Sequence, residues 1–167
     1  GGDRSNGQYA VLALRDAANF GVNIERSVWE RIQRQWVEGQ NQDGGWGYQH
    51  PGIKSEPSSG SMTVAGLSTV AITMRMLHDD SDTDAEGRVG CCEPHPPPDA
   101  LRKGRAWLSY RAPFSIQTNP KGSGWHFYYL YGLERAGRLS GVRFFGKHDW
   151  YRAGARMLTS GNRQAAN

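Results

Sequence analysis

The sequence has little cysteine and no long apolar run. Its 167 residues include two cysteines, which are adjacent at Cys91 and Cys92. Adjacent cysteines do not readily bond to each other, so no framework of spaced disulfides is expected. No apolar stretch approaches the roughly 18 residues of a transmembrane helix, and we predict no membrane span. The first residues resemble neither a signal peptide nor a transit peptide, and the sequence leaves the cellular compartment open.

The basic residues are not clustered in the sequence, as they would be on a nucleic-acid-binding surface. The chain carries 20 basic and 16 acidic residues, a formal net charge of +4. Its arginines are scattered along helical segments, without helix-turn-helix spacing or an aromatic RNA-binding signature, and we expect no nucleic-acid partner. Strand-type alternation is also scarce. The 22 glycines are therefore assigned to helix ends and turns.

Apolar periodicity predicts six helices, paired as three consecutive hairpins in a single domain over residues 1–167. In the second helix Trp29, Ile32 and Trp36 form one apolar stripe. The third is apolar nearly all round and is expected to be buried on several sides. Residues 78–98 form a polar insertion without periodicity, which predicts a long surface loop. The predicted helices cover about residues 5–18, 25–37, 61 or 63 to 78, 99–111, 124–138, and 148 or 149 onward.

Two turns rich in glycine each deliver a tryptophan at the end of a helical pattern. The first contains Gln40, Gly44 and Trp46, and the second, a stretched copy, runs from Gln117 through Gly122 to Trp125. Recurring turns of this kind indicate stacked helix-pair repeats, in which each pair buries its apolar face against the next.

These turns resemble the Gln-Trp motif of the prenyltransferase and squalene oxidase repeat family, which includes squalene-hopene cyclases and protein prenyltransferase beta subunits. The resemblance implies that Gln and Trp tie a helix end to its neighbour. It also implies an all-α fold, a partial α/α toroid of inner and outer helices around an apolar cavity. Family members commonly use five to seven hairpins, so three predict a fragment of a larger protein. Residues 128–137 and 148–151 are also similar to large bacterial proteins of this repeat class.

The polar insertion contains the candidate catalytic acids. Squalene-hopene cyclases use an Asp-x-Asp-Asp motif, and Asp82 and Asp84 match it except at the last position. The catalytic acid must be buried and protonated, whereas these residues belong to a polar, acidic run whose ordinary role is a solvated surface. With Asp80 they also provide the oxygen ligands that Mg²⁺ prefers, although no predicted helix presents them.

One group of metal-ligating residue types is close together in the sequence. Cys91, Cys92 and His95 match the types that hold zinc in protein prenyltransferases, with Asp99 nearby. Structural zinc sites prefer two separated pairs of ligands, so an ordinary loop with thiols is the competing interpretation. We expect no bound cofactor.

The aromatic residues of the fifth predicted helix suit a binding cavity. Trp125, Tyr128 and Tyr131 are the candidate ligand contacts, because electron-rich ring faces attract cations and carbocations. Core packing is the competing role for such large side chains.

The sequence leaves two functions open. By resemblance, the domain binds or cyclises an apolar isoprenoid; alternatively, it is a noncatalytic helical-repeat scaffold that binds a protein or an extended ligand.

Overall fold

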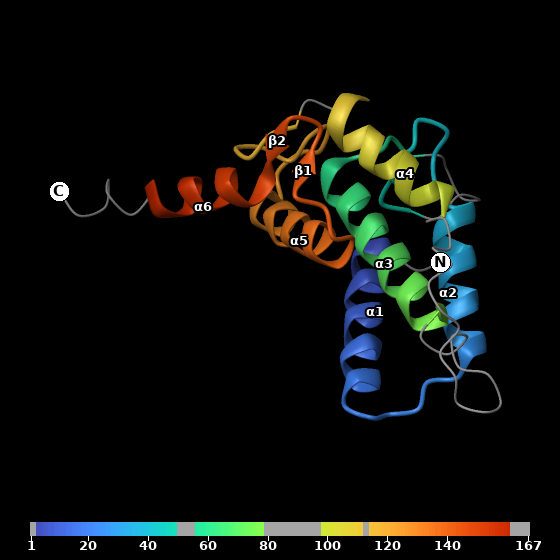
Figure 1. Ribbon diagram of the computed structural model, residues 1–167. Helices are drawn as coiled ribbons and strands as arrows, with labels where there is room; N and C mark the ends of the chain where they lie inside the picture. Colours follow the sequence, from blue (N-terminus) through green and yellow to red (C-terminus); the bar gives the residue numbers. More distant parts are fainter. Residues whose placement is uncertain (1–2, 50–55, 79–97, 112–113, 161–167) are drawn as a thin grey trace.

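Helices make up most of the computed structural model, which describes residues 3–49, 56–78, 98–111 and 114–160 (Figure 1). This confirms the predicted all-α class, and the insertion at 79–97 lies outside the described residues. Within that part of the chain no helix is both long and apolar enough to cross a membrane. The elements are α1 (Arg4–Asn19), α2 (Arg26–Glu38), α3 (Gly60–His78), α4 (Asp99–Ala106), the π-helical segment η1 (Trp107–Arg111), α5 (His126–Leu139), the antiparallel strands β1 (Phe144–Phe145) and β2 (His148–Asp149), and α6 (Trp150–Ser160).

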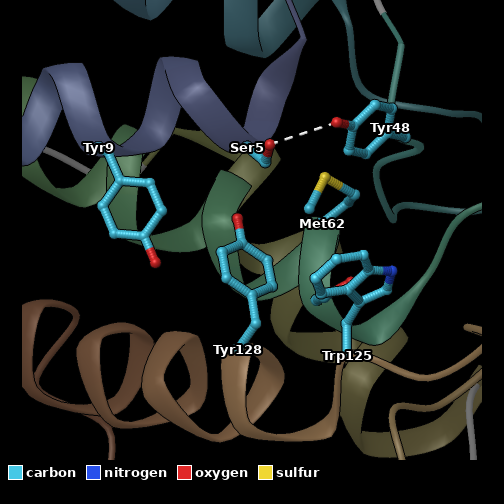
Figure 2. A pocket seen from close by; sticks show the side chains of 7 residues that line it. Ser5, Tyr9, Tyr48, Met62, Trp125 and Tyr128 are labelled. Carbon is cyan, nitrogen blue, oxygen red and sulfur yellow. Dashed lines mark hydrogen bonds between the residues drawn. The ribbon is translucent and has the colours of Figure 1, made fainter.

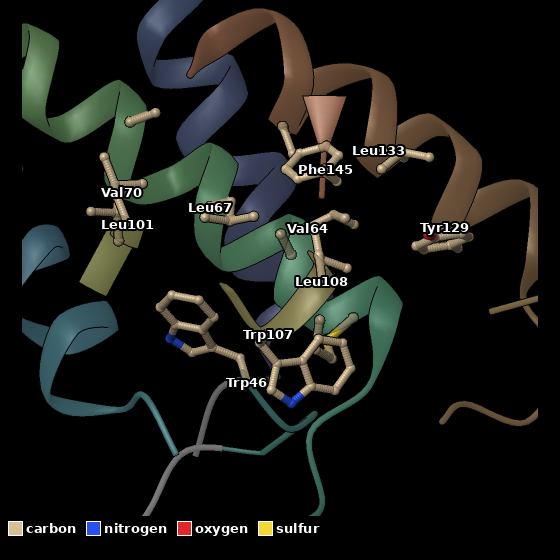
Figure 3. Close-up of a cluster of buried hydrophobic side chains, with 14 of the residues drawn as sticks. Trp46, Val64, Leu67, Val70, Leu101, Trp107, Leu108, Tyr129, Leu133 and Phe145 are labelled. Carbon is tan, nitrogen blue, oxygen red and sulfur yellow. The ribbon is translucent and has the colours of Figure 1, made fainter. Parts of the chain in front are cut away.

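The third helix is the centre of the fold, as its apolar composition predicts. α3 packs against α1, α2, α4 and α5 and is buried on nearly all sides (Figures 1 and 3). Two of its buried hydroxyl groups bond within the helix, where Ser68 donates to the carbonyl of Val64 and Thr73 to that of Thr69. A helix surrounded by other helices tolerates polar side chains only when they are bonded in this way.

The first glycine-rich turn fastens the end of α2 to two other helices. Gln40 Nε2 donates to the carbonyl of Gly44 at 2.8 Å and to that of Ala100, in the first turn of α4, at 2.9 Å. Trp46 is fully buried, and its Nε1 donates to the carbonyl of Trp36 at 2.9 Å. The Trp46 indole therefore satisfies a carbonyl group in the last turn of α2, where carbonyls lack partners within the helix.

Two glycines in helix interiors make room for the Trp46 ring. A Cβ atom on Gly66 of α3 would overlap the ring, and one on Gly104 of α4 would lie 2.8 Å from its Cζ3 atom. Glycine inside a helix is unfavourable by roughly 0.5–1 kcal/mol relative to alanine. Here the loss is offset by burial of an indole where α2, α3 and α4 meet (Figure 3).

A carboxylate holds the same turn from its other side. Asp43 accepts hydrogen bonds from Ser58 Oγ at 2.7 Å, from the Gly45 N–H at 3.0 Å and from Trp107 Nε1 at 2.8 Å. Partial burial opposes ionisation of Asp43, but these hydrogen bonds outweigh it and lower the pKa of the carboxyl below its ordinary 3.8. The ionised form of Asp43 therefore stabilises the folded state.

The α5–α6 connection uses a tryptophan in a related way. Trp150 Nε1 donates to the carbonyl of Val142 at 2.6 Å, just beyond the end of α5. The Trp150 ring lies against Gly137, where a Cβ atom would overlap it. Trp150 thus packs against a helix glycine, as Trp46 does in the first turn.

Gly66→Ala tests the packing of the Trp46 ring. We expect the free energy of unfolding to fall by about 1–3 kcal/mol, because the added methyl overpacks the contact. Gly7→Ala is the matched control, since the nearest atom to a Cβ there is 3.8 Å away. That control should leave stability unchanged or raise it by up to about 1 kcal/mol. Equal effects of the two substitutions in chemical denaturation would contradict the packing.

Asp43→Asn tests the carboxylate. At pH 7 we expect a loss of about 1–3 kcal/mol in the free energy of unfolding, because hydrogen bonds to a charged group are lost. The folded-state pKa of Asp43 lies below 3.8, so its contribution is present above that value and disappears as pH falls through the folded pKa. Unfolding curves of the two proteins should therefore converge in strong acid. A difference that stays constant from neutral to strongly acidic pH would refute the assignment.

Candidate functional site

A cavity of about 290 Å³ lies where the starts of α1, α3 and α5 meet (Figure 2). Four of the seven residues around it are aromatic, and five carry a hydroxyl group. Tyr48 and Ser5 face the cavity from one side, and Trp125 and Tyr128 rise from the start of α5 to meet them. The lining residues are Ser5, Tyr9, Tyr48, Ser61, Met62, Trp125 and Tyr128.

A buried arginine sets the first side of the cavity. Arg4 is 3% exposed, and its guanidinium donates to the carbonyls of Gly39 at 2.6 Å and Gly47 at 2.9 Å. The Arg4 N–H also donates to the carbonyl of Tyr48 at 3.2 Å. These bonds attach the first turn of α1 to the Gln40–Tyr48 turn. Tyr48 is thereby held beside Ser5, whose hydroxyl lies 3.4 Å from the Tyr48 hydroxyl.

An asparagine joins the start of α3 to the start of α5. Asn119 is buried, and its Oδ1 accepts from the Ser61 N–H at 2.8 Å. Its Nδ2 donates to Ser61 Oγ at 3.1 Å and to the carbonyl of Gly124 at 3.3 Å. The Gly60 N–H donates to the carbonyl of Pro120 at 2.6 Å. One amide side chain therefore satisfies the Ser61 N–H in the first turn of α3 and links it to the residue before Trp125.

The second glycine-rich turn is built differently from the first, which corrects the expected role of two of its residues. Gln117 is exposed and Trp125 is 79% exposed, so neither ties helices together as Gln40 and Trp46 do. Asn119 does so instead, and the predicted motif residue Gly122 lies against its amide. The sequence similarity of the turns concealed this exchange, because both contain a Gln, glycines and a Trp at similar spacing.

Trp125 has an unusual backbone conformation. Its φ of 53° and ψ of 36° are left-handed, and the residue precedes the first turn of α5. A non-glycine residue in this region typically costs 1–3 kcal/mol. No burial of the indole offsets that cost, since the side chain stands at the rim of the cavity (Figure 2).

Tyr128 forms the wall opposite Tyr48. Its hydroxyl donates to Gln8 Oε1 at 2.8 Å, and the ring centroids of Tyr128 and Tyr9 are 6.1 Å apart. Burial, with smaller effects from Tyr9 and Asp3, raises the pKa of Tyr128. The phenol therefore stays protonated at neutral pH. Tyr131, the third predicted contact, does not line the cavity but stacks on Tyr9 at 6.1 Å.

The sequence analysis identified part of this site. Trp125 and Tyr128 were predicted contacts and both line the cavity, whereas Tyr9, Tyr48 and Met62 were not singled out. Tyr48 ends the first glycine-rich turn, which was a usable signal. Tyr9 lies within the first predicted helix, and nothing in the sequence brings it to α5.

The predicted acid and metal residues cannot be placed. They lie outside the described residues and are Asp82, Asp84, Cys91, Cys92 and His95. Across residues 3–49, 56–78, 98–111 and 114–160, no group of three or more His, Cys, Asp or Glu side chains is arranged to hold a metal ion.

Asn119→Ala and Gln117→Ala together test which residue builds the second turn. We expect Asn119→Ala to lower the free energy of unfolding by about 2–4 kcal/mol, because it removes the acceptor of the buried Ser61 N–H and a donor to the Ser61 hydroxyl. Gln117→Ala, at an exposed position, should change it by no more than about 0.5 kcal/mol. Chemical denaturation of both variants measures this, and the reverse order of effects would show that Gln117 is the fastening residue.

Comparison with known proteins identifies no relative. No protein-family model matches the sequence, and searches of curated proteins and of solved structures gave no significant match. Function is therefore inferred from the geometry of the cavity.

Proposed function

We propose that the chain is a helical-repeat binding domain that holds its ligand in the cavity at the starts of α1, α3 and α5. The observation that carries this proposal is the lining: four aromatic rings and five hydroxyl groups around a space of about 290 Å³. Small-molecule sites are typically concave and largely apolar, with a few polar groups that orient the ligand. This lining has that composition.

The lining residues favour binding over catalysis by the described part of the chain. Their rings offer contact area, and their hydroxyls offer hydrogen bonds. Burial raises the pKa of Tyr128. The shift takes it further from the range in which a general base works at neutral pH. The cavity is thus suited to a noncatalytic role as a scaffold for an extended ligand.

The helix order supports a repeat arrangement for this scaffold. In our proposal α1, α3 and α5 are the inner helices of a partial α/α toroid, and α2, α4 and α6 are the outer ones. α3 packs against both α1 and α5. Trp46, in the turn after α2, and Trp150, at the start of α6, contact glycines of adjacent helices. Inner-helix starts would then form a row, along which an extended ligand can lie.

The resemblance to cyclases and prenyltransferases supports a second candidate, an isoprenoid chain as the ligand. Met62 and the four rings give the cavity an apolar wall, which a hydrocarbon chain would cover. In this version the candidate catalytic residues remain those of the insertion.

A titration with cyclohexanol and with geraniol tests the proposed site by amide-resolved NMR. We expect at least one of these neutral probes to cause saturable shifts that are largest at Ser5, Tyr9, Ser61 and Tyr128. Trp125→Ala should weaken the effect several-fold, because a stacking face is lost. The control is Tyr110→Ala, which removes an aromatic ring outside the cavity. Tyr110 is 81% exposed and Trp125 is 79% exposed. Saturable binding elsewhere, or none, would reject the proposal.

A further inference from the structure

We propose that the ligand of this cavity is a carbohydrate and that the extended ligand of the scaffold is a glycan chain. The proposal rests on the proposed binding function and names the ligand class. A sugar ring has faces of C–H groups and an edge of hydroxyl groups. The cavity offers both kinds of surface, since aromatic rings and hydroxyl groups both line it (Figure 2).

The hydroxyl groups distinguish a sugar from a hydrocarbon. Ser5 donates its one proton to Asp3, so the Tyr48 hydroxyl, which lies 3.4 Å from Ser5 Oγ, receives no proton from Ser5 and keeps an acceptor site for a ligand. Within the described residues, the hydroxyl of Tyr9 makes no hydrogen bond at all, and its side chain lines the cavity half-exposed. A hydrocarbon would cover these groups and leave them without partners, which is unfavourable. A ligand with several hydroxyls would satisfy them.

The charges around the cavity favour a neutral ligand. None of the seven lining residues is charged. The carboxylate closest along the chain, Asp3, is bonded to Ser5 and to the Asn6 N–H, which lower its pKa and engage it at the start of α1. A helix start carries roughly half a positive charge, which offsets much of that carboxylate. The lining therefore offers an ion no charged side chain to pair with.

Trp125 supplies a stacking face at the mouth of the cavity. Its indole is 79% exposed and stands next to Met62 and Tyr128, although its backbone is held in the left-handed region. Backbone strain that internal packing does not offset occurs preferentially where a residue contacts a ligand. A cavity of about 290 Å³ is small for a ligand site. It suits one sugar ring, with the next ring lying over Trp125.

Binding of soluble hexasaccharides tests the inference. Cellohexaose, chitohexaose and maltohexaose are titrated into the full chain and followed by NMR of the tryptophan indole N–H signals. We expect at least one to bind saturably and to shift the Trp125 signal. Trp125→Ala should reduce its affinity by about tenfold, the effect of losing one aromatic stacking contact. Tyr110→Ala should leave the affinity unchanged.

The double variant Tyr9→Phe with Tyr48→Phe separates sugar recognition from apolar binding. It keeps both rings and removes two hydroxyls, so hexasaccharide affinity should fall severalfold while cyclohexanol or geraniol binding persists. If the neutral probes bind and no hexasaccharide does, the carbohydrate inference is overturned and the binding proposal stands. If neither class binds, both fail. Hexasaccharide binding that Trp125→Ala leaves unchanged would place any sugar site elsewhere and also overturn the inference.

Discussion

The buried indole of Trp46 is the contact on which the rest of the structure depends. Its ring fills the space left by Gly66 and Gly104, and its N–H closes the end of α2 through the carbonyl of Trp36. The helices α2 and α4 are thereby fixed relative to α3 at a single point. Because protein interiors are packed to crystal-like density, a larger residue at either glycine cannot be absorbed without moving a helix.

This fastening also determines where the cavity lies. The turn that buries Trp46 continues directly to Tyr48, and Arg4 ties it to the start of α1. In the second turn Asn119 takes over the fastening, so that Trp125 is not required for packing and is exposed at the cavity instead. One turn thus uses its tryptophan for stability, and the corresponding tryptophan of the other is available for binding.

Periodicity and turn chemistry were sufficient to predict the helices, because an apolar stripe or an all-apolar helix has few other uses in a domain of this size. The burial of α3 followed from the same signals, whereas the fastening role of Gln40 and Trp46 was implied by the resemblance of their turn to the Gln-Trp motif. The short β1–β2 pair was missed, since two-residue strands have no alternation to detect. The fastening role of Asn119 and the meeting of Tyr9 with Tyr128 depend on tertiary contacts between distant segments, which local sequence does not encode.

The most direct test of the account is the position of the Trp46 ring, measured by NMR through nuclear Overhauser effects in the native chain. Cross-peaks from the Trp46 ring protons to the α-protons of both Gly66 and Gly104, with an indole N–H that exchanges slowly with solvent, are the predicted result. A rapidly exchanging indole N–H without either cross-peak would contradict the account, because α2, α3 and α4 would then lack their common contact.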